Sequence, residues 1–170
     1  NHDYKRDVFP IVEPLIFGTA SRIMSLKDGT SKMSKSDASD FSRINMTDDT
    51  DAIARKIKKA KTDPDALPSE VEGLKGRAEA ANLVGIYAAL ANSDVADVLG
   101  EFGGQGFGTF KPALADLAVD KLSPIQNELR RLMGAPEAVD AVLRSGAERA
   151  RALAEPILKE VQDTVGFLHP

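Results

Sequence analysis

The sequence Arg22-Ile-Met-Ser-Leu-Lys-Asp-Gly-Thr-Ser-Lys-Met-Ser-Lys-Ser-Asp37 contains the most informative part of this chain, the pentapeptide Lys32–Ser36 with the letters KMSKS. Its two lysines are three residues apart, in a segment too polar and too rich in glycine and serine for a hydrophobic core. Such a loop can bring two ammonium groups and several hydroxyl and backbone donors against a polyphosphate. The pattern therefore predicts a phosphate-binding loop, and the alternative is an ordinary solvated surface loop.

The bulk composition of the 170 residues is that of a globular protein, with 42% apolar and 28% charged residues. Aromatic residues make up only 5% and tryptophan is absent, so we expect closely packed helices built on leucine, valine, isoleucine and alanine. The absence of cysteine excludes disulfides, zinc fingers, iron–sulfur clusters and a thiol nucleophile within this sequence. The two histidines, His2 and His169, lie at opposite ends, so no histidine metal site is predicted.

Charge and hydropathy narrow the class of protein further. The net charge of −4 argues against a protein that coats nucleic acid nonspecifically, and local basic patches remain compatible with it. No apolar run approaches the ~18 residues that a membrane span needs, and no signal peptide is recognisable. We therefore expect a cytoplasmic protein without a membrane partner. Because the chain begins at Asn1 without a methionine, we expect it to be the later part of a longer protein.

The order of the sequence patterns predicts a mainly α chain in two parts. Residues 1–46 are expected to be the end of an α/β unit, with short strands at 15–17, 22–26 and 41–46. Over residues 47–170 the apolar periodicity is helical, and Thr47 is the expected N-cap of the first helix. Further helices are predicted at 77–91, 93–99, 109–132, 137–143 and 145–165. The expected N-caps among them are Ser93, Thr109 and Ser145, and Gly166 is the expected C-cap of the last helix.

A series of motifs follows along the chain: RIMSL at 22–26, KMSKS at 32–36, KIKKAKTD at 56–63, ANLVGIY at 81–87 and GFGTFK at 106–111, with SPIQ at 123–126. In this order they resemble the class I aminoacyl-tRNA synthetases, and among these the tryptophanyl-tRNA synthetases. The resemblance covers nearly the whole chain. Tyrosyl-tRNA synthetases share the KMSKS signature, but GFGTFK with a downstream SPIQ is closer to the tryptophan family.

The resemblance implies a fold and a reaction. Residues 1–46 would be the edge of the class I α/β nucleotide-binding domain that carries the KMSKS loop. Residues 47–170 would be the all-helical anticodon-binding bundle, with the option that the last helix packs back on the catalytic domain. In that family tryptophan and ATP, bound with Mg²⁺, give tryptophanyl-adenylate and pyrophosphate, and the acyl group then passes to tRNA(Trp). The resemblance also implies a homodimer, and no metal site is expected in this chain.

The resemblance assigns ATP binding to one set of residues: Ile23, Lys32, Met33, Ser34, Lys35 and Ser36. Lys32 and Lys35 would be catalytic, because they would hold the triphosphate, with Lys35 taking the larger share as charge builds on pyrophosphate. The two serines would donate hydroxyl hydrogen bonds, and Met33 would pack near the adenine. Ile23 corresponds to an adenine-pocket position, and an ordinary core isoleucine is the alternative.

The family also needs a HIGH-type element and a tryptophan pocket, both upstream of the KMSKS loop. With histidines only at positions 2 and 169, no such element is recognisable in this sequence. We therefore expect a C-terminal fragment that depends on a missing N-terminal half for tryptophan and is inactive alone.

Basic residues provide candidate RNA contacts. The segment Arg55–Lys61 has five basic and no acidic residues among its seven positions, which suits either a solvated helix end or contact with a tRNA backbone. The candidate tRNA-binding residues are Lys58, Lys59, Lys111 and Arg130. Tyr87 and Phe110 are expected to be core residues, not platforms for base stacking.

Two other interpretations stay open. The chain could be a noncatalytic helical RNA-binding or interaction module that kept the loop, or a fragment of a tyrosyl-type class I synthetase.

Overall fold

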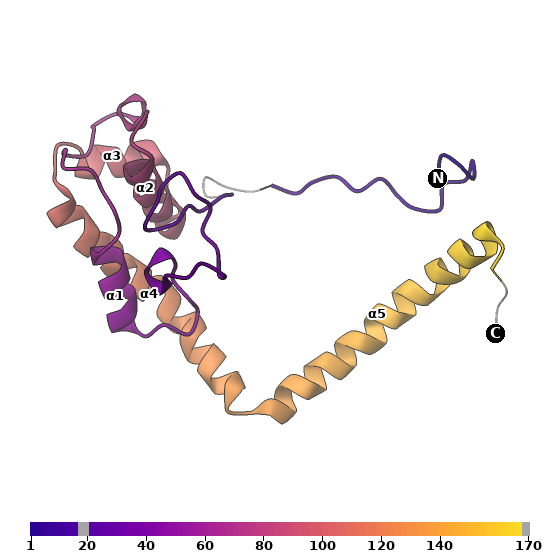
Figure 1. Cartoon of the computed structure of the whole chain (residues 1–170). Coiled ribbons are helices and arrows are strands. Elements are labelled where there is room, and N and C mark those ends of the chain that lie inside the picture. The colour runs from indigo at the N-terminus through magenta and orange to yellow at the C-terminus, as the bar shows by residue number, and fades with distance from the viewer. Residues whose placement is uncertain (17–20, 168–170) are drawn as a thin grey trace. The chain divides into compact units, whose positions relative to one another are not determined.

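The computed structural model describes residues 1–16 and 21–167 and is mainly helical in this range (Figure 1). The helices are α1 (Thr50–Lys58), α2 (Ala78–Ala91), α3 (Val95–Phe102), α4 (Phe107–Met133) and α5 (Pro136–Val165), with two short 3-10 helices, η1 (Asp40–Ser42) and η2 (Val71–Leu74). The mainly α prediction is confirmed. The chain divides into two compact units, one formed by Ile16–Arg130 and one by Asn1–Leu15 with Arg131–Pro170. These units follow spatial compactness, and the functional boundary at residues 46/47 stays a prediction.

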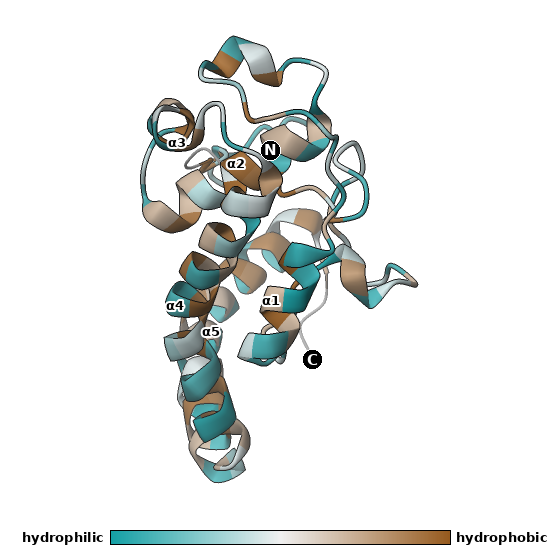
Figure 2. Ribbon diagram, turned by 90° about the vertical axis from the view of Figure 1, so that its left-hand side faces the viewer, coloured by the Kyte–Doolittle hydropathy of each residue, from teal (hydrophilic) through white to brown (hydrophobic). Residues whose placement is uncertain are grey.

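The hydrophobic core of the Ile16–Arg130 unit is built mainly from leucine, isoleucine, valine and alanine, as the composition predicted. Each of α1 to α4 places apolar side chains in it, and the fully buried large ones include Ile53, Ile57, Leu83, Leu99 and Leu114. Figure 2 shows the resulting alternation of polar and apolar bands on α1. Burial of one such side chain contributes about 1.5–3 kcal/mol, so this core is the main stabilising element of the unit.

Aromatic rings from three helices meet in the same core. The Phe102 ring lies 5.2 Å from that of Tyr87 and 5.1 Å from that of Phe110, both in edge-to-face geometry. Phe110 is fully buried and Tyr87 partly buried, so the core assignment of both residues is confirmed.

The predicted short strands are not formed within the described residues, apart from a single antiparallel bridge between Met24 and Lys32. At 22–26 no further strand among the described residues pairs with the outer edge of the segment, because the side chain of Asn82 occupies that place. The Asn82 amide accepts a hydrogen bond from Met24 N at 2.9 Å and donates one to Met24 O at 3.0 Å. At 41–46 the chain turns through η1, and at 15–17 residues 15 and 16 are irregular while residue 17 lies outside the described range.

The predicted helix positions are right within a few residues, but the four expected N-caps are wrong. Thr109 lies inside α4 and Ser145 lies inside α5. The α1 N-cap is Asp49, whose carboxylate accepts from Ala52 N at 2.7 Å, and not Thr47. The α3 N-cap is Asp94, which forms a capping box with Asp97, one residue beyond the predicted Ser93. A carboxylate at the cap also complements the positive end of the helix dipole, which favours aspartate over the neighbouring hydroxyl residues.

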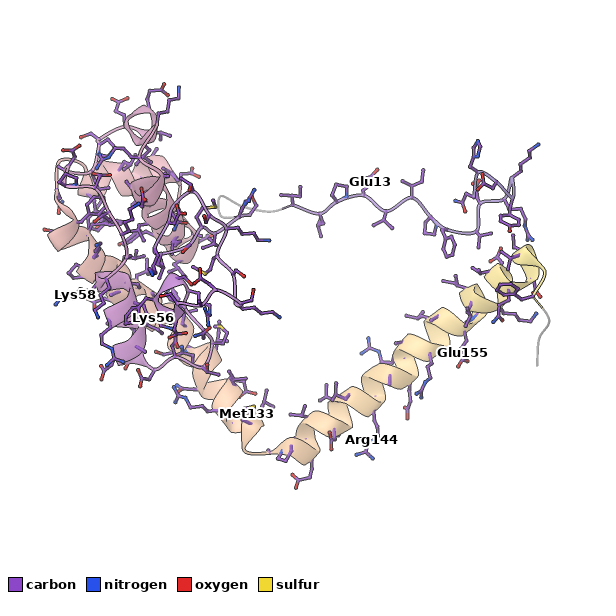
Figure 3. The ribbon with its side chains drawn as sticks, in the orientation of Figure 1. Glu13, Lys56, Lys58, Met133, Arg144 and Glu155 are labelled. Carbon is purple, nitrogen blue, oxygen red and sulfur yellow. The ribbon has the colours of Figure 1, made fainter. Side chains whose placement is uncertain are left out.

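The second unit contains one continuous helix, α5, where two were predicted at 137–143 and 145–165. Pro136 occupies the first turn, where a missing N–H costs nothing, and Gly166 ends the helix in the left-handed conformation at φ 79°. No described side chain of this unit is buried, and Figure 3 shows Arg144 and Glu155 projecting from α5. Arg6 contacts the end of α5 through a hydrogen bond to Thr164 at 3.2 Å.

Among the described residues no single helix is long and apolar enough to cross a membrane. Only together do α2 and α3 have the length and apolar composition of a span, and a bend of 107° separates them.

Candidate functional site

The KMSKS segment leaves the core through a hairpin-like base. Ser25 N donates to Ser31 O at 2.8 Å, and Met33 N donates to Ile23 O at 3.0 Å. The Met24–Lys32 bridge lies between these bonds. The first residues of the pentapeptide are therefore fixed to the segment that Asn82 attaches to α2.

Asp28 closes the turn between the two limbs of this base. Its carboxylate accepts from the Ser31 hydroxyl at 2.6 Å, from the Thr30 hydroxyl at 2.6 Å and from Thr30 N at 3.0 Å. These hydrogen bonds favour the ionised form and lower the pKa of Asp28 to about 2. Gly29, inside the turn, touches the start of α2 so closely that a Cβ would lie 2.5 Å from Ala78 C. The turn thus needs both the carboxylate and the glycine.

The tip of the loop presents its cations to solvent. Lys32 and Lys35 are exposed, and the hydroxyls of Ser34 and Ser36 lie 3.0 Å apart on the same turn. Ser36 N donates to the Ser34 hydroxyl at 3.3 Å, which tightens the turn around Lys35. Lys35 and two hydroxyls on one small exposed turn, with the exposed Lys32 in the bridge before it, are a suitable donor set for a triphosphate.

Met33 and Ile23 face away from the exposed tip. Both are half-buried and line an apolar hollow of about 240 Å³ together with residues of α2 and α4. Ile23 is therefore half-buried beside Met33 in this hollow. This position suits either the adenine-pocket role or a packing role.

A second limb returns from the loop to α1, and sequence reasoning missed its anchor. The Arg43 guanidinium donates from Nη1 to Asp37 O at 3.0 Å and to Ser39 O at 3.3 Å. Its Nε donates to Asn45 Oδ1 at 3.0 Å. One arginine thereby holds the backbone that follows the KMSKS serines.

Lys56 departs from the interpretation of the basic cluster as a solvated helix end, whereas the other four cations of Arg55–Lys61 are exposed. Its side chain is only 3% exposed, and its ammonium lies 2.7 Å from Asp40 Oδ2 and 2.6 Å from Asp48 Oδ2. Lys56 lies three and four residues from Ile53 and Ala60 in the buried helical register, and this spacing was the signal that could have revealed it. Figure 3 shows Lys56 and its neighbour Lys58 on α1.

The four candidate RNA-contacting residues differ in their surroundings. Lys58 is exposed, and Lys59 is exposed with its ammonium 4.6 Å from the centre of the Phe41 ring. Arg130 is exposed and donates to Asn127 Oδ1 at 3.0 Å. The structure thus leaves these three cations at the surface.

Lys111 has protein partners of its own. Its ammonium donates to Ala60 O at 2.7 Å and to Lys58 O at 3.4 Å, at the carboxyl end of α1. Partial burial lowers the pKa of Lys111. The negative end of the α1 dipole explains why a lysine is favourable near the start of α4. Lys111 also lines a hollow of about 480 Å³ with Lys58 and Phe107, so two of the candidate residues share one surface depression.

A metal-binding group of three or more His, Cys, Asp or Glu side chains does not occur within residues 1–16 and 21–167.

Comparisons with known proteins place this geometry in a family. A family model described as tRNA synthetases class I (W and Y) matches residues 2–122. The chain is 69% identical over 160 residues to the tryptophan--tRNA ligase of Agrobacterium fabrum, which covers 94% of this chain and 45% of that protein. The tryptophan--tRNA ligase of Rickettsia conorii is 42% identical over 168 residues, covering 99% of this chain and 50% of that protein.

A solved structure supports the same relationship. The crystal structure of tryptophanyl-tRNA synthetase from Mycoplasma pneumoniae matches with a TM-score of 0.73 at 27% identity, over 89% of this chain and 47% of that one. The chain spans about half the length of the curated relatives it matches. From the matched residues, the relatives and the shared fold together, we conclude that the chain belongs to the class I tRNA synthetases of the tryptophan and tyrosine family.

Proposed function

We propose that this chain supplies the KMSKS loop and RNA-contacting helices of a tryptophan–tRNA ligase. Such an enzyme activates tryptophan with ATP to the adenylate, releases pyrophosphate, and transfers the acyl group to tRNA(Trp). The observation that carries the proposal is the exposed loop segment with Lys32 and Lys35, whose base is fixed by Asp28 and Asn82. Relatives named tryptophan--tRNA ligase, at up to 69% identity, support the choice of amino acid.

Each residue of the loop has a chemical role in this proposal. Lys32 binds the triphosphate in the ground state, and Lys35 follows the negative charge that develops on the leaving pyrophosphate. Ser34 and Ser36 exchange their mutual hydrogen bond for bonds to phosphate oxygens. Met33 and Ile23 offer apolar surface on the adenine side. Mg²⁺ would come as the complex with ATP and would neutralise charge on the phosphates beside Lys32 and Lys35.

The helices of the same unit provide the RNA surface in this proposal. Lys58, Lys59 and Arg130 contact the tRNA backbone, and Lys111 borders the shared depression near the start of α4. The remainder of the enzyme supplies the tryptophan pocket, the enzyme acts as a homodimer, and its place is the cytoplasm. Residues 1–46 belong to the catalytic domain and residues 47–170 to the anticodon-binding domain.

A chimera tests the proposal directly. This chain would replace the corresponding 160 residues of the Agrobacterium fabrum relative, and tryptophan-dependent ATP–pyrophosphate exchange would be measured. We expect tryptophan-dependent exchange from the chimera and none from the 170-residue chain alone. A folded chimera without exchange, beside an active parent enzyme, would favour the noncatalytic module and refute the proposal.

A further inference from the structure

Lys56 is a buried cation at the centre of a polar network that the proposed chemistry does not use. Its ammonium bridges two carboxylates from different turns of the chain, Asp40 at 2.7 Å and Asp48 at 2.6 Å. The side chain of Asp48 is 10% exposed, and that of Asp40 is 57% exposed. One end of the bridge is therefore inside the protein and the other reaches its surface.

A buried lysine at this position destabilises the folded state unless its ammonium is paired. Removing an ammonium from water destabilises the folded state, and an apolar side chain of similar size is often at least as stabilising as a buried ion pair. Burial alone would lower the pKa of Lys56, but the hydrogen bonds with Asp40 and Asp48 outweigh it, and the pKa is raised. Lys56 therefore keeps its charge at all ordinary pH values.

The two carboxylates hold the segment that returns from the KMSKS loop. Asp40 accepts a second hydrogen bond from Asn45 Nδ2 at 2.8 Å, and Asp48 accepts one from Asn45 N at 2.8 Å. The backbone carbonyl of Asp48 accepts from Gln126 Nε2 at 2.7 Å. Gln126 is 1% exposed and belongs to α4, so the segment is attached to two helices.

Arg43 continues this network to the loop itself. Its guanidinium lies 3.5 Å from Asp40 Oδ1, and it donates to the carbonyls of Asp37 and Ser39. Asp37 is the residue after Ser36, and its N–H donates to Ser34 O at 3.3 Å. Successive contacts therefore lead from the ammonium of Lys56 to the turn that carries Lys35.

We propose that Lys56 is a positioning residue for the KMSKS loop: by bridging Asp40 and Asp48 it fixes the return limb 37–48, and so sets where the Lys35 turn stands. In this proposal Lys56 acts through Asp40 and Asp48 and not by contact with a substrate. The consequence for phosphate chemistry rests on the proposed function, whereas the mechanical consequence for the limb does not.

Hydrogen exchange on the 170-residue chain tests the mechanical part. Lys56→Met keeps the apolar stem and removes the ammonium. We expect amides of residues 37–48 to exchange about tenfold faster or more, as for a segment that opens locally, while amides of α2 and α3 keep their rates. Lys121→Met, at an exposed lysine of α4, is the matched control and should leave residues 37–48 unchanged.

Two further variants keep the test decisive if Lys56→Met unfolds. The double variant Lys56→Met with Asp48→Asn removes the buried unpaired carboxylate, so it should recover stability without recovering the slow exchange of the limb. Asp40→Ala leaves the Lys56–Asp48 pair in place and should loosen residues 37–43 alone. Wild-type exchange rates in the limb of either folded variant would overturn the proposal.

Kinetics of the chimera test the chemical part. For the double variant we expect kcat of adenylate formation to fall between about 10-fold and 100-fold, because a displacement near 1 Å can cost about 100-fold, with the tryptophan KM unchanged. A purely structural role would lower the amount of active enzyme and leave kcat per active site unchanged. If the unsubstituted chimera is inactive, the proposed function fails, and the exchange measurement alone still decides whether Lys56 positions the limb.

Discussion

The side-chain amide of Asn82 satisfies both backbone polar groups of Met24, accepting from its N–H at 2.9 Å and donating to its carbonyl at 3.0 Å. Asn82 is nearly buried in α2, 58 residues further along the chain. A single side chain from a helix thus does for the RIMSL segment what a neighbouring strand would do in a sheet, and it sets the position from which the KMSKS loop departs.

Replacing Asn82 by alanine should therefore destabilise the Ile16–Arg130 unit. Two backbone groups of Met24 lose their partners, and a buried polar group without a partner costs about 1–3 kcal/mol, so we expect a loss of about 2 kcal/mol in the free energy of unfolding. Urea unfolding followed by circular dichroism measures it. Asn127→Ala, at an exposed position of α4, is the control and should change the free energy by less than about 0.5 kcal/mol. Equal midpoints for both variants would contradict the role of Asn82.

The turn at Asp28 should make stability depend on pH in the acid range. The folded-state pKa of about 2 lies below the ordinary value of 3.8, because hydrogen bonds from Ser31 and Thr30 favour the carboxylate. The stabilisation is therefore complete above the ordinary pKa and is lost as pH falls through the folded-state value. Unfolding of wild type and Asp28→Asn, compared from about pH 5 down to about pH 2, should show a difference in stability that shrinks toward low pH. A difference that stays constant over this range would show that the carboxylate is not the group responsible.

Lys58 and Lys111 should behave differently although both border the same depression. Lys58 is exposed, so Lys58→Met in the chimera should weaken tRNA binding for all sequences alike and reduce the salt slope by about 1. Lys111 donates to the end of α1, so Lys111→Met should mainly lower stability, by about 0.3–1 kcal/mol as for a cation at a helix carboxyl end. Filter binding across a salt series and thermal unfolding measure the two effects. An equal loss of salt slope in both variants would assign Lys111 to the RNA surface as well.

Recognition of the tRNA should depend on its anticodon more than on bulk charge. The chain has a net charge of −4, so a large counterion-release contribution is restricted to local patches. Unpaired bases are recognised by stacking and by hydrogen bonds to their edges, which changes of sequence destroy. The chimera should therefore bind anticodon-substituted tRNA much more weakly than tRNA(Trp), with a moderate salt slope. Equal affinity for both, with a steep slope, would favour the nonspecific module.

The helices were predictable from sequence because their signals are local. The 77–91 prediction differs from α2 at Ala78–Ala91 by one residue, since the apolar positions and the ends of that helix are determined by neighbours within one or two turns. The predicted end of α5 at Gly166 is confirmed for the same reason. The motif KMSKS likewise announced an exposed two-lysine loop without help from distant residues.

The contacts that position the site were not predictable in this way, because each depends on a partner far along the sequence. Lys111 meets the end of α1 across 51 residues, and Gln126 meets Asp48 across 78. The helical periodicity placed Lys56 on the buried face of α1, but its charge suggested an exposed side chain. Only the structure shows that Asp40 and Asp48 neutralise the buried ammonium. The strand predictions were wrong because an alternating pattern predicts an extended segment but does not identify the group that pairs with it.

Lys35 is the residue proposed to stabilise charge on the departing pyrophosphate, and single-turnover adenylate formation by the chimera tests this role most directly. Lys35→Ala should raise the activation free energy by about 2–4 kcal/mol, as for loss of one preorganised donor, and so slow adenylate formation. The dissociation constant of ATP should change much less. An unchanged rate with only weaker ATP binding would show that the loop holds the nucleotide without acting on the transition state, which would contradict the account.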